Sequence, residues 1–423
     1  MTGRIITNMV YREQVTEKKN FIWNMIGSGI YAASSMLLSM FVINTIGAKE
    51  GGIFSIALTL SQMLVYIAYY EMRTFQVTDT QDEFTFAEYH ATKIIMCFVM
   101  IIVSALYVFI KQYSLNKGTV IMLVCFVRFL DGYADVYEAQ FQKCGRLDLA
   151  GKSLAYRTGM FVITLCVVLI ISKNLIISLI IADIVAIVGV FVFDIKVMTI
   201  LDNVACSFSK EKICAIIKKC FPLFVGVFCW TYILSASRIA IDGNMSSEYQ
   251  AYYQVIFMPV SVINLFSGFV LRPMLPRLSE DYSAGAYKEF KWFLYKGICG
   301  IFVITGVCML GAFVVGIPVL SLLSGCDLDE YKGILVFLLF AGGINAIAYT
   351  MYYVLTIMRC PKGILFGYIL SALLAFLISA PCVRYGGIKG AAGSYFIVVL
   401  VLCMLFGIAI IGQVINLKRN KDK

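Results

Sequence analysis

Charge, histidine and proline are all scarce in this sequence of 423 residues. Only 14% of the residues are charged, one is histidine and seven are proline. Soluble proteins carry about 25% charged residues, so this composition excludes an ordinary soluble domain. Hydrophobic residues make up 61% of the chain, and its mean hydropathy is +0.87. The apolar residues form long runs instead of short alternating segments, which predicts an all-α integral membrane protein and excludes a membrane β-barrel.

Several motifs that would indicate a metal or nucleotide site are also absent. None of the fourteen cysteines forms a Cys-x-x-Cys pair, and most lie inside apolar runs, so they are expected to pack as small hydrophobic side chains. The single histidine, His90, has no neighbouring ligand cluster and is expected at a membrane interface. No Gly-x-x-x-x-Gly-Lys-Ser/Thr motif is present, which argues against ATP-driven transport. We therefore expect neither a metal site nor a cofactor.

The apolar runs, punctuated by Gly, Pro and charged residues, predict about twelve membrane spans. They are predicted at 21–47, 53–70, 91–111, 118–142, 154–172, 174–198, 216–241, 249–272, 292–316, 333–357, 363–383 and 390–416. If the N-terminus is inside, the cytoplasmic segments hold 26 of the 35 lysines and arginines and the outer loops hold 8. This asymmetry places both termini in the cytoplasm. The net charge of +10 is explained by the same basic residues, which orient the chain in the membrane and contact anionic lipids. It therefore does not indicate binding to nucleic acid.

The two halves of the chain resemble each other in the order of their turns. The turn Glu50–Phe54 has a counterpart at Glu248–Tyr252, and the exit from the fourth predicted span, Gln142–Arg146, has one at Met358–Lys362. This order predicts two pseudo-symmetric six-helix bundles around a central cavity. The expected divisions are a cytoplasmic N-terminal segment at 1–20, bundles at 21–200 and 216–416, a cytoplasmic linker at 201–215 and a basic tail at 417–423.

The fourth predicted span, 118–142, carries a polar stripe. Arg128, Asp131, Asp135, Glu138 and Gln142 are three or four residues apart, so a helix would place them all on one face. A charged side chain at the centre of a bilayer costs about 2.5–3.5 kcal/mol, so the stripe should face a bundle interior or a water-filled cavity. Three acids against one base predict surplus negative charge there. A substrate path and a fixed Arg–Asp staple between helices both fit this pattern.

Six stretches of the chain resemble polysaccharide transporters of the multidrug/oligosaccharidyl-lipid/polysaccharide exporter (MOP) superfamily, which include O-antigen and capsular-polysaccharide flippases. They are Asn44–Phe54, Glu71–Asp79, Phe221–Phe224, Ser237–Asp242, Phe257–Phe266 and Arg272–Leu275. The resemblance covers nearly the whole chain. It implies a non-enzymatic flippase that works by alternating access in the bacterial cell membrane. The implied cargo is an undecaprenyl-pyrophosphate-linked oligosaccharide repeat unit for surface polysaccharide, and a polysaccharide polymerase is an implied partner.

One departure from the superfamily narrows the cargo. Flippases for the peptidoglycan lipid precursor carry basic residues within their first two spans, facing the cavity. Here Lys49 is the only basic residue between Asn20 and Arg73. Transport of the peptidoglycan precursor is therefore not expected.

The proposed chemistry assigns candidate site residues. The anionic diphosphate requires cations, and Arg128 is the only basic residue predicted deep in a span. Sugars require aromatic faces and hydrogen-bonding groups. The candidate substrate-binding residues are Arg73, Arg128, Asp131, Tyr133, Tyr137, Gln142, Trp230 and Arg272. The candidates for coupling to a proton or sodium ion are Asp135, Glu138 and Asp183, of which Asp183 has no obvious partner along the chain.

Two other functional classes fit parts of the sequence. A cation-coupled multidrug antiporter would share the fold, but it would require an acidic pocket with fewer sugar-binding groups. A membrane-embedded glycan polymerase or ligase would usually carry a large outer loop for catalysis, and no predicted outer loop is long enough to fold as a domain.

The predicted orientation is testable by cysteine labelling in a background without other cysteines. A membrane-impermeant maleimide should label Lys117→Cys in intact cells, whereas Lys143→Cys should react only after lysis, because the two residues flank one predicted span. Labelling of Lys143→Cys from outside intact cells would contradict the orientation.

Overall fold

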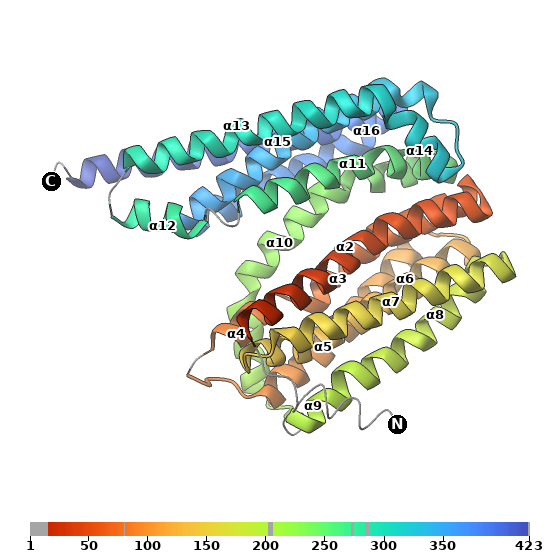
Figure 1. Cartoon of the computed structure of the whole chain (residues 1–423), viewed down its shortest axis with the longest axis horizontal. Helices are drawn as coiled ribbons and strands as arrows, with labels where there is room; N and C mark the ends of the chain where they lie inside the picture. The colour runs from red at the N-terminus through yellow and green to blue at the C-terminus, as the bar shows by residue number, and fades with distance from the viewer. Residues whose placement is uncertain (1–15, 80, 202–205, 272–274, 285–286, 422–423) are drawn as a thin grey trace. The chain divides into compact units, whose positions relative to one another are not determined.

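The computed structural model of the chain describes residues 16–79, 81–201, 206–271, 275–284 and 287–421. These residues are largely helical and contain no strand, so the expected all-α membrane architecture is confirmed (Figure 1). They belong to two compact units, Met1–Phe228 and Cys229–Lys423.

The first unit contains six membrane-length passes. Its helices are α2 (Glu17–Ile46), α3 (Ala48–Tyr69), the short α4 (Met72–Thr78), α5 (Phe86–Ile110), α6 (Leu115–Lys143), α7 (Leu147–Ser172) and α8 (Leu175–Val190), and α8 continues through a π-helical turn, η1 (Phe191–Ile195), into α9 (Lys196–Leu201). The long α10 (Lys210–Asn244) begins in the first unit and ends in the second.

The second unit continues the same helical pattern. Its remaining elements are α11 (Ser247–Leu271), α12 (Leu275–Ser283), α13 (Tyr287–Gly311), the π-helical η3 (Ala312–Gly316), α14 (Ile317–Ser324), the 3-10 turn η4 (Asp329–Tyr331), α15 (Lys332–Ile357) and α16 (Pro361–Lys421). The backbone of Gly387 is non-helical, with φ 54° and ψ −136°, so α16 comprises two passes.

Length and hydropathy identify nine membrane-capable helices among the described residues, and the longest of these includes both passes of α16. Helix α6 carries the charged residues of the polar stripe, and its 29 residues are long enough to cross a bilayer. Counted with α6, the 25-residue α11 and the second pass of α16, the spans agree with the expected number of about twelve.

Polar side chains fix several helix starts in the first unit. Ser114 and Asn174 accept hydrogen bonds from the backbone N–H groups of Lys117 and Ile177, which would otherwise be unpaired at the starts of α6 and α8. Thr85 and Glu88 form a capping box at the start of α5. These caps set where each helix begins.

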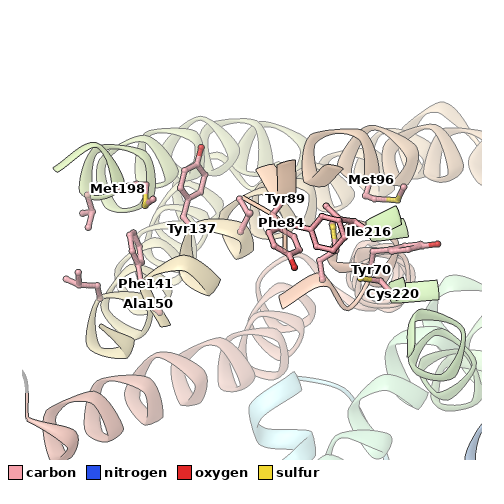
Figure 2. Close-up of a cluster of buried hydrophobic side chains, with 14 residues drawn as sticks. Tyr70, Phe84, Tyr89, Met96, Tyr137, Phe141, Ala150, Met198, Ile216 and Cys220 are labelled. Carbon is pink, nitrogen blue, oxygen red and sulfur yellow. The ribbon is translucent and has the colours of Figure 1, made fainter. Parts of the chain in front are cut away.

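A cluster of buried apolar residues joins one end of the first unit's helices (Figure 2). Tyr137 and Phe141 of α6 belong to it, as do Phe84 and Tyr89 near the start of α5. The first part of α10 contributes Ile216 and Cys220 to this cluster, and Phe224 stacks on Tyr70 with ring centroids 4.5 Å apart. The start of α10 is therefore anchored in the first unit.

Glycines permit the close approach of α2 and α7. A Cβ atom on Gly151 would lie 2.3 Å from the carbonyl oxygen of Trp23, and one on Gly27 would lie 2.4 Å from the carbonyl oxygen of Gly151. Such distances would force the two backbones apart. The helices pack closely here because small residues let membrane helices make extensive van der Waals contact.

Gly151→Ala should therefore destabilise the first unit by about 1–3 kcal/mol, as overpacking does in other tightly packed interiors. Gly159→Ala is the matched control, because a Cβ there has no atom within 4 Å outside its own helix backbone. Thermal unfolding of the detergent-purified chain would measure both variants. Equal midpoints for the two variants would contradict the close packing of α2 and α7.

Candidate functional site

The polar stripe predicted from residue spacing lies on a buried face of α6. Arg128, Asp131, Asp135 and Glu138 are each only 5–7% exposed. Nη1 of Arg128 donates hydrogen bonds of 2.8 Å to Asp131 and to the hydroxyl of Tyr31 on α2. The Arg128 guanidinium also lies over the Tyr31 ring, 5.0 Å from its centroid. Arg128 is therefore enclosed by its own helix and by α2.

Two further cations, Lys93 of α5 and Arg157 of α7, face this stripe from neighbouring helices. Nζ of Lys93 lies 2.8 Å from a carboxylate oxygen of Asp135. Nη2 of Arg157 lies 3.4 Å from Asp131 and 3.1 Å from Glu138, and its Nη1 lies 2.8 Å from Asp194 in η1. Both cations are almost completely buried. The prediction that Arg128 is the only basic residue deep in a span is therefore wrong.

Arg73 completes the charge network from α4. Its Nη1 lies 3.3 Å from Asp135 and 3.0 Å from Glu138, and its Nε and Nη2 donate hydrogen bonds to the side-chain oxygen of Gln142. The helix is interrupted between α3 and α4, where Tyr70 and Glu71 adopt left-handed backbone conformations. This interruption directs Arg73 toward α6. The helix end exposes the carbonyl of Tyr69, which accepts a hydrogen bond from Lys93.

The network joins equal numbers of positive and negative groups. Its cations are Arg73, Lys93, Arg128 and Arg157, and its carboxylates are Asp131, Asp135, Glu138 and Asp194. The expected surplus of negative charge on this face is therefore wrong, because neighbouring helices supply cations that the spacing along α6 cannot show. A neutral, fully paired set lowers the cost of burying each ion.

Each of the three acids on α6 has two cationic partners. Asp131 is shared by Arg128 and Arg157, Asp135 by Lys93 and Arg73, and Glu138 by Arg157 and Arg73. Arg73 or Arg128 can consequently leave the network without stranding a carboxylate on α6. Arg157 contacts three acids, so its removal would affect all of them.

Two cavities border opposite ends of this network. The first, about 430 Å³ in volume, is lined by Glu71, Arg73, Thr74, Asp135 and Gln142 among others. The second, of about 30 Å³, lies beside Tyr31, Arg128 and Asp131 and can hold only one or two water molecules. A ligand larger than water can therefore reach Arg73, but not Arg128, in this conformation.

The tyrosines predicted on α6 belong to a hydrogen-bonded cluster with His90. His90 Nε2 lies 3.0 Å from the hydroxyls of both Tyr133 and Tyr137, which lie 2.8 Å from each other, and His90 Nδ1 lies 2.9 Å from Sγ of Cys206. His90 is 3% exposed and lies in the first turns of α5, so its side chain is held by this cluster. Tyr137 is fully buried and cannot reach a ligand in this conformation.

Among the described residues, the predicted site residues Asp183 and Trp230 are not part of the network. Asp183 of α8 is buried, and neither of its carboxylate oxygens has a hydrogen-bond partner. Trp230 lies in the second unit, where its ring packs against those of Tyr349 and Tyr368, with centroids 6.4 and 5.7 Å away. Arg272 lies outside the described residues.

The loop that follows α4 is held by Asp79. Desolvation opposes ionisation of this carboxyl group, but hydrogen bonds from the backbone N–H groups of Glu83 and Phe84, of 3.0 and 3.1 Å, outweigh it. They hold the pKa of Asp79 below its ordinary value. The loop is therefore fixed by an ionised side chain close to the helix that carries Arg73.

The chain shares its fold with solved structures of membrane transporters. No family model matches it. It is 22% identical over 328 residues to the capsular polysaccharide biosynthesis protein CapF of Staphylococcus aureus, a match that spans 76% of this chain and 81% of that protein. It resembles the lipid II flippase MurJ in an inward closed conformation with a TM-score of 0.68 at 14% identity, over 90% of this chain and 86% of MurJ.

A multidrug transporter has a similar structure. An inward-facing MATE family transporter of the MOP superfamily matches with a TM-score of 0.63 at 11% identity, over 100% of this chain and 99% of that one. At these identities the likeness establishes the fold alone. The resemblance to the MOP superfamily that the sequence suggested is confirmed at that level.

Arg157→Gln should destabilise the chain by about 3–5 kcal/mol, because it leaves Asp194 buried without its cation. Adding Asp194→Asn should restore part of this loss. The control Lys143→Gln should cost less than about 1 kcal/mol, because Lys143 pairs with the exposed Asp82. The measurement is thermal unfolding of the detergent-purified variants. An Arg157→Gln variant as stable as the control would contradict the role assigned to Arg157.

Proposed function

We propose that this chain, which has the fold of the MOP superfamily exporters, is a flippase for an undecaprenyl-pyrophosphate-linked oligosaccharide. The cargo would cross the bacterial cell membrane by alternating access and would supply surface polysaccharide synthesis, with a polysaccharide polymerase as a downstream partner. The match to a capsular polysaccharide biosynthesis protein over 76% of the chain supports this choice among the activities found on the fold. We assign the chain a transport role and no catalytic one.

The observation that carries the proposal is the cavity at Arg73. A lipid diphosphate is anionic, and a guanidinium binds phosphate oxygens with two parallel hydrogen bonds. The Arg73 side chain is 32% exposed and faces a cavity of about 430 Å³. In the predicted orientation this end of α3 faces the cytoplasm, where the cargo is made. Gln142 and Thr74 add hydrogen-bonding groups at the same place.

Binding of the diphosphate would draw Arg73 away from its carboxylates. Asp135 would keep Lys93, and Glu138 would keep Arg157, so neither acid would lose all of its positive partners. The departure of Arg73 would still leave the network with one positive charge fewer than its negative charges. A proton or a sodium ion taken up at Asp135 or Glu138 would restore the balance, which is how we propose that ion uptake accompanies reorientation. Asp183 is a second candidate, because its buried carboxyl group has no partner.

Arg128 would engage the diphosphate later in the cycle. It is closed off by Tyr31 and Asp131 here, and the adjoining cavity has a volume of only about 30 Å³. Separation of α2 from α6 would be needed to expose it. Asp131 would then keep Arg157 as its partner at 3.4 Å.

The sugar portion of the cargo requires a different kind of surface. Trp230, Tyr349 and Tyr368 present neighbouring aromatic rings in the second unit, and the hydroxyl of Tyr349 lies 2.7 Å from that of Tyr353. Flat apolar rings with hydroxyls beside them suit the alternating apolar and polar faces of a sugar. We assign Trp230 to this role.

A cation-coupled multidrug antiporter is the second candidate, favoured by the likeness to the MATE family transporter. Such a protein should export organic cations. The larger cavity is lined by Arg73 and also by the acids Glu71 and Asp135, so its lining offers contacts to a cation as well as to a phosphate.

Reconstituted vesicles would distinguish the two candidates. A fluorescent lipid-linked oligosaccharide should change leaflet in vesicles containing the wild-type chain, whereas an organic cation such as ethidium should not be transported. Arg73→Gln should slow flipping by about tenfold or more, because the loss of a charge-assisted pair of hydrogen bonds costs more than about 1.4 kcal/mol. The flipping rate of Arg73→Lys should lie between those of the wild-type chain and Arg73→Gln, since lysine keeps the charge but loses the bidentate geometry.

The control is Arg359→Gln, which removes an exposed arginine from the end of α15. It should leave the flipping rate unchanged at equal protein abundance. Wild-type flipping by Arg73→Lys would refute bidentate recognition, and transport of ethidium without flipping of the glycan lipid would favour the antiporter.

A further inference from the structure

Arg238 of α10, in the second unit, differs from the buried cations of the first unit. Lys93, Arg128, Lys152 and Arg157 are each buried beside a carboxylate. Arg238 is half-buried, and among the described residues no carboxylate forms an ion pair with its guanidinium. Its positive charge is therefore not balanced by a neighbouring acid in the described part of the chain.

The hydrogen-bonding capacity of Arg238 is only partly used. Nη1 donates to the side-chain oxygen of Gln254 at 3.3 Å, and Nη2 donates to the carbonyl oxygen of Leu234 at 3.1 Å. Nε is buried and has no partner. A guanidinium has five N–H groups, so several remain for a ligand. The Phe257 ring lies under the guanidinium, 5.0 Å from its central carbon, and limits access from that side.

Two more side chains near this position have unsatisfied polar atoms. Gln250, one helical turn before Gln254 on α11, is fully buried, and neither its amide nitrogen nor its amide oxygen has a hydrogen-bond partner. The hydroxyl of Tyr395 on α16 is also buried and unpaired, and the Tyr395 ring packs against Phe257 with centroids 5.1 Å apart. Buried polar atoms without partners are rare in folded proteins.

We propose that Arg238, Gln250 and Tyr395 form an oxyanion-binding site in the second unit. Unsatisfied donors come from three different helices, and the only charge among them is positive. A phosphate or carboxylate group would accept hydrogen bonds from these donors and would balance the guanidinium. The ligand chemistry is that of a diphosphate ester or of an acidic sugar, and both can occur in one lipid-linked glycan. The assignment of this ligand to the cargo rests on the proposed function, whereas the existence of the site does not.

Binding of small anions to the detergent-purified full chain tests the site. The Arg73→Gln background removes the anion-binding group proposed in the first unit. In this background, inorganic pyrophosphate or glucuronate should bind by calorimetry, and methyl glucoside, which is neutral, should not. Adding Arg238→Gln should weaken that binding by about tenfold or more. Adding Tyr395→Phe should weaken it by a smaller factor with little change in packing. Adding Arg384→Gln, an exposed arginine in the same unit, should leave it unchanged.

Farnesyl diphosphate and glucuronate distinguish the two sources of the anion. Tighter binding of farnesyl diphosphate identifies the site as one for the lipid diphosphate, and tighter binding of glucuronate identifies it as one for an acidic sugar. Absence of binding by both pyrophosphate and glucuronate in the Arg73→Gln chain would overturn the proposal. The proposal would also be overturned if adding Arg238→Gln and adding Tyr395→Phe both left the anion affinity within about twofold of that of the Arg73→Gln chain. If the chain with Arg238→Gln fails to fold, the chain with Tyr395→Phe still tests the site.

Failure of the flippase proposal would give a different result. Vesicles that flip no glycan lipid while the purified chain keeps Arg238-dependent anion binding would refute the function and leave the site. Normal flipping without such binding would refute the site and leave the function.

Discussion

The interior of the first unit depends on Arg157, which contacts the three carboxylates of Asp131, Glu138 and Asp194. Burying ions in an apolar interior is costly, and the cost is offset only where each charge has an opposite partner in good geometry. Arg157 reaches from α7 to both α6 and η1, so the packing of these elements and the pairing of the charges require each other. The remaining cations are arranged around this fixed centre.

Sharing of carboxylates gives some cations of the network freedom to move. Arg73 and Arg128 each share an acid with another cation, so either can move without leaving a carboxylate of α6 unpaired. The position of Arg73 depends on the helix interruption at Tyr70 and Glu71. Their left-handed backbone conformations cost about 1–3 kcal/mol each, because neither residue is a glycine. The hydrogen bonds of Arg73 and of Gln76, which contacts Val136 and Gln140, offset that strain by attaching α4 to α6.

The two units treat buried positive charge differently. In the first unit the buried cations are paired with acids, which lowers the cost of burying both. In the second unit, Arg238 lies against the Phe257 ring and the side-chain amide of Gln254, and no carboxylate in the described part of the chain pairs with it.

The sequence by itself determined the membrane class, the approximate number of spans and the shared face of Arg128, Asp131, Asp135 and Glu138, because hydropathy and helical periodicity depend only on residue order. It did not reveal the partners of that face. Lys93 and Arg157 lie near the starts of the predicted spans 91–111 and 154–172, but the helices begin earlier, so the two residues lie about two and three turns inside α5 and α7. Only the tertiary structure decided the charge balance, because an ion pair between helices depends on their packing and rotation, which spacing along a single helix does not specify.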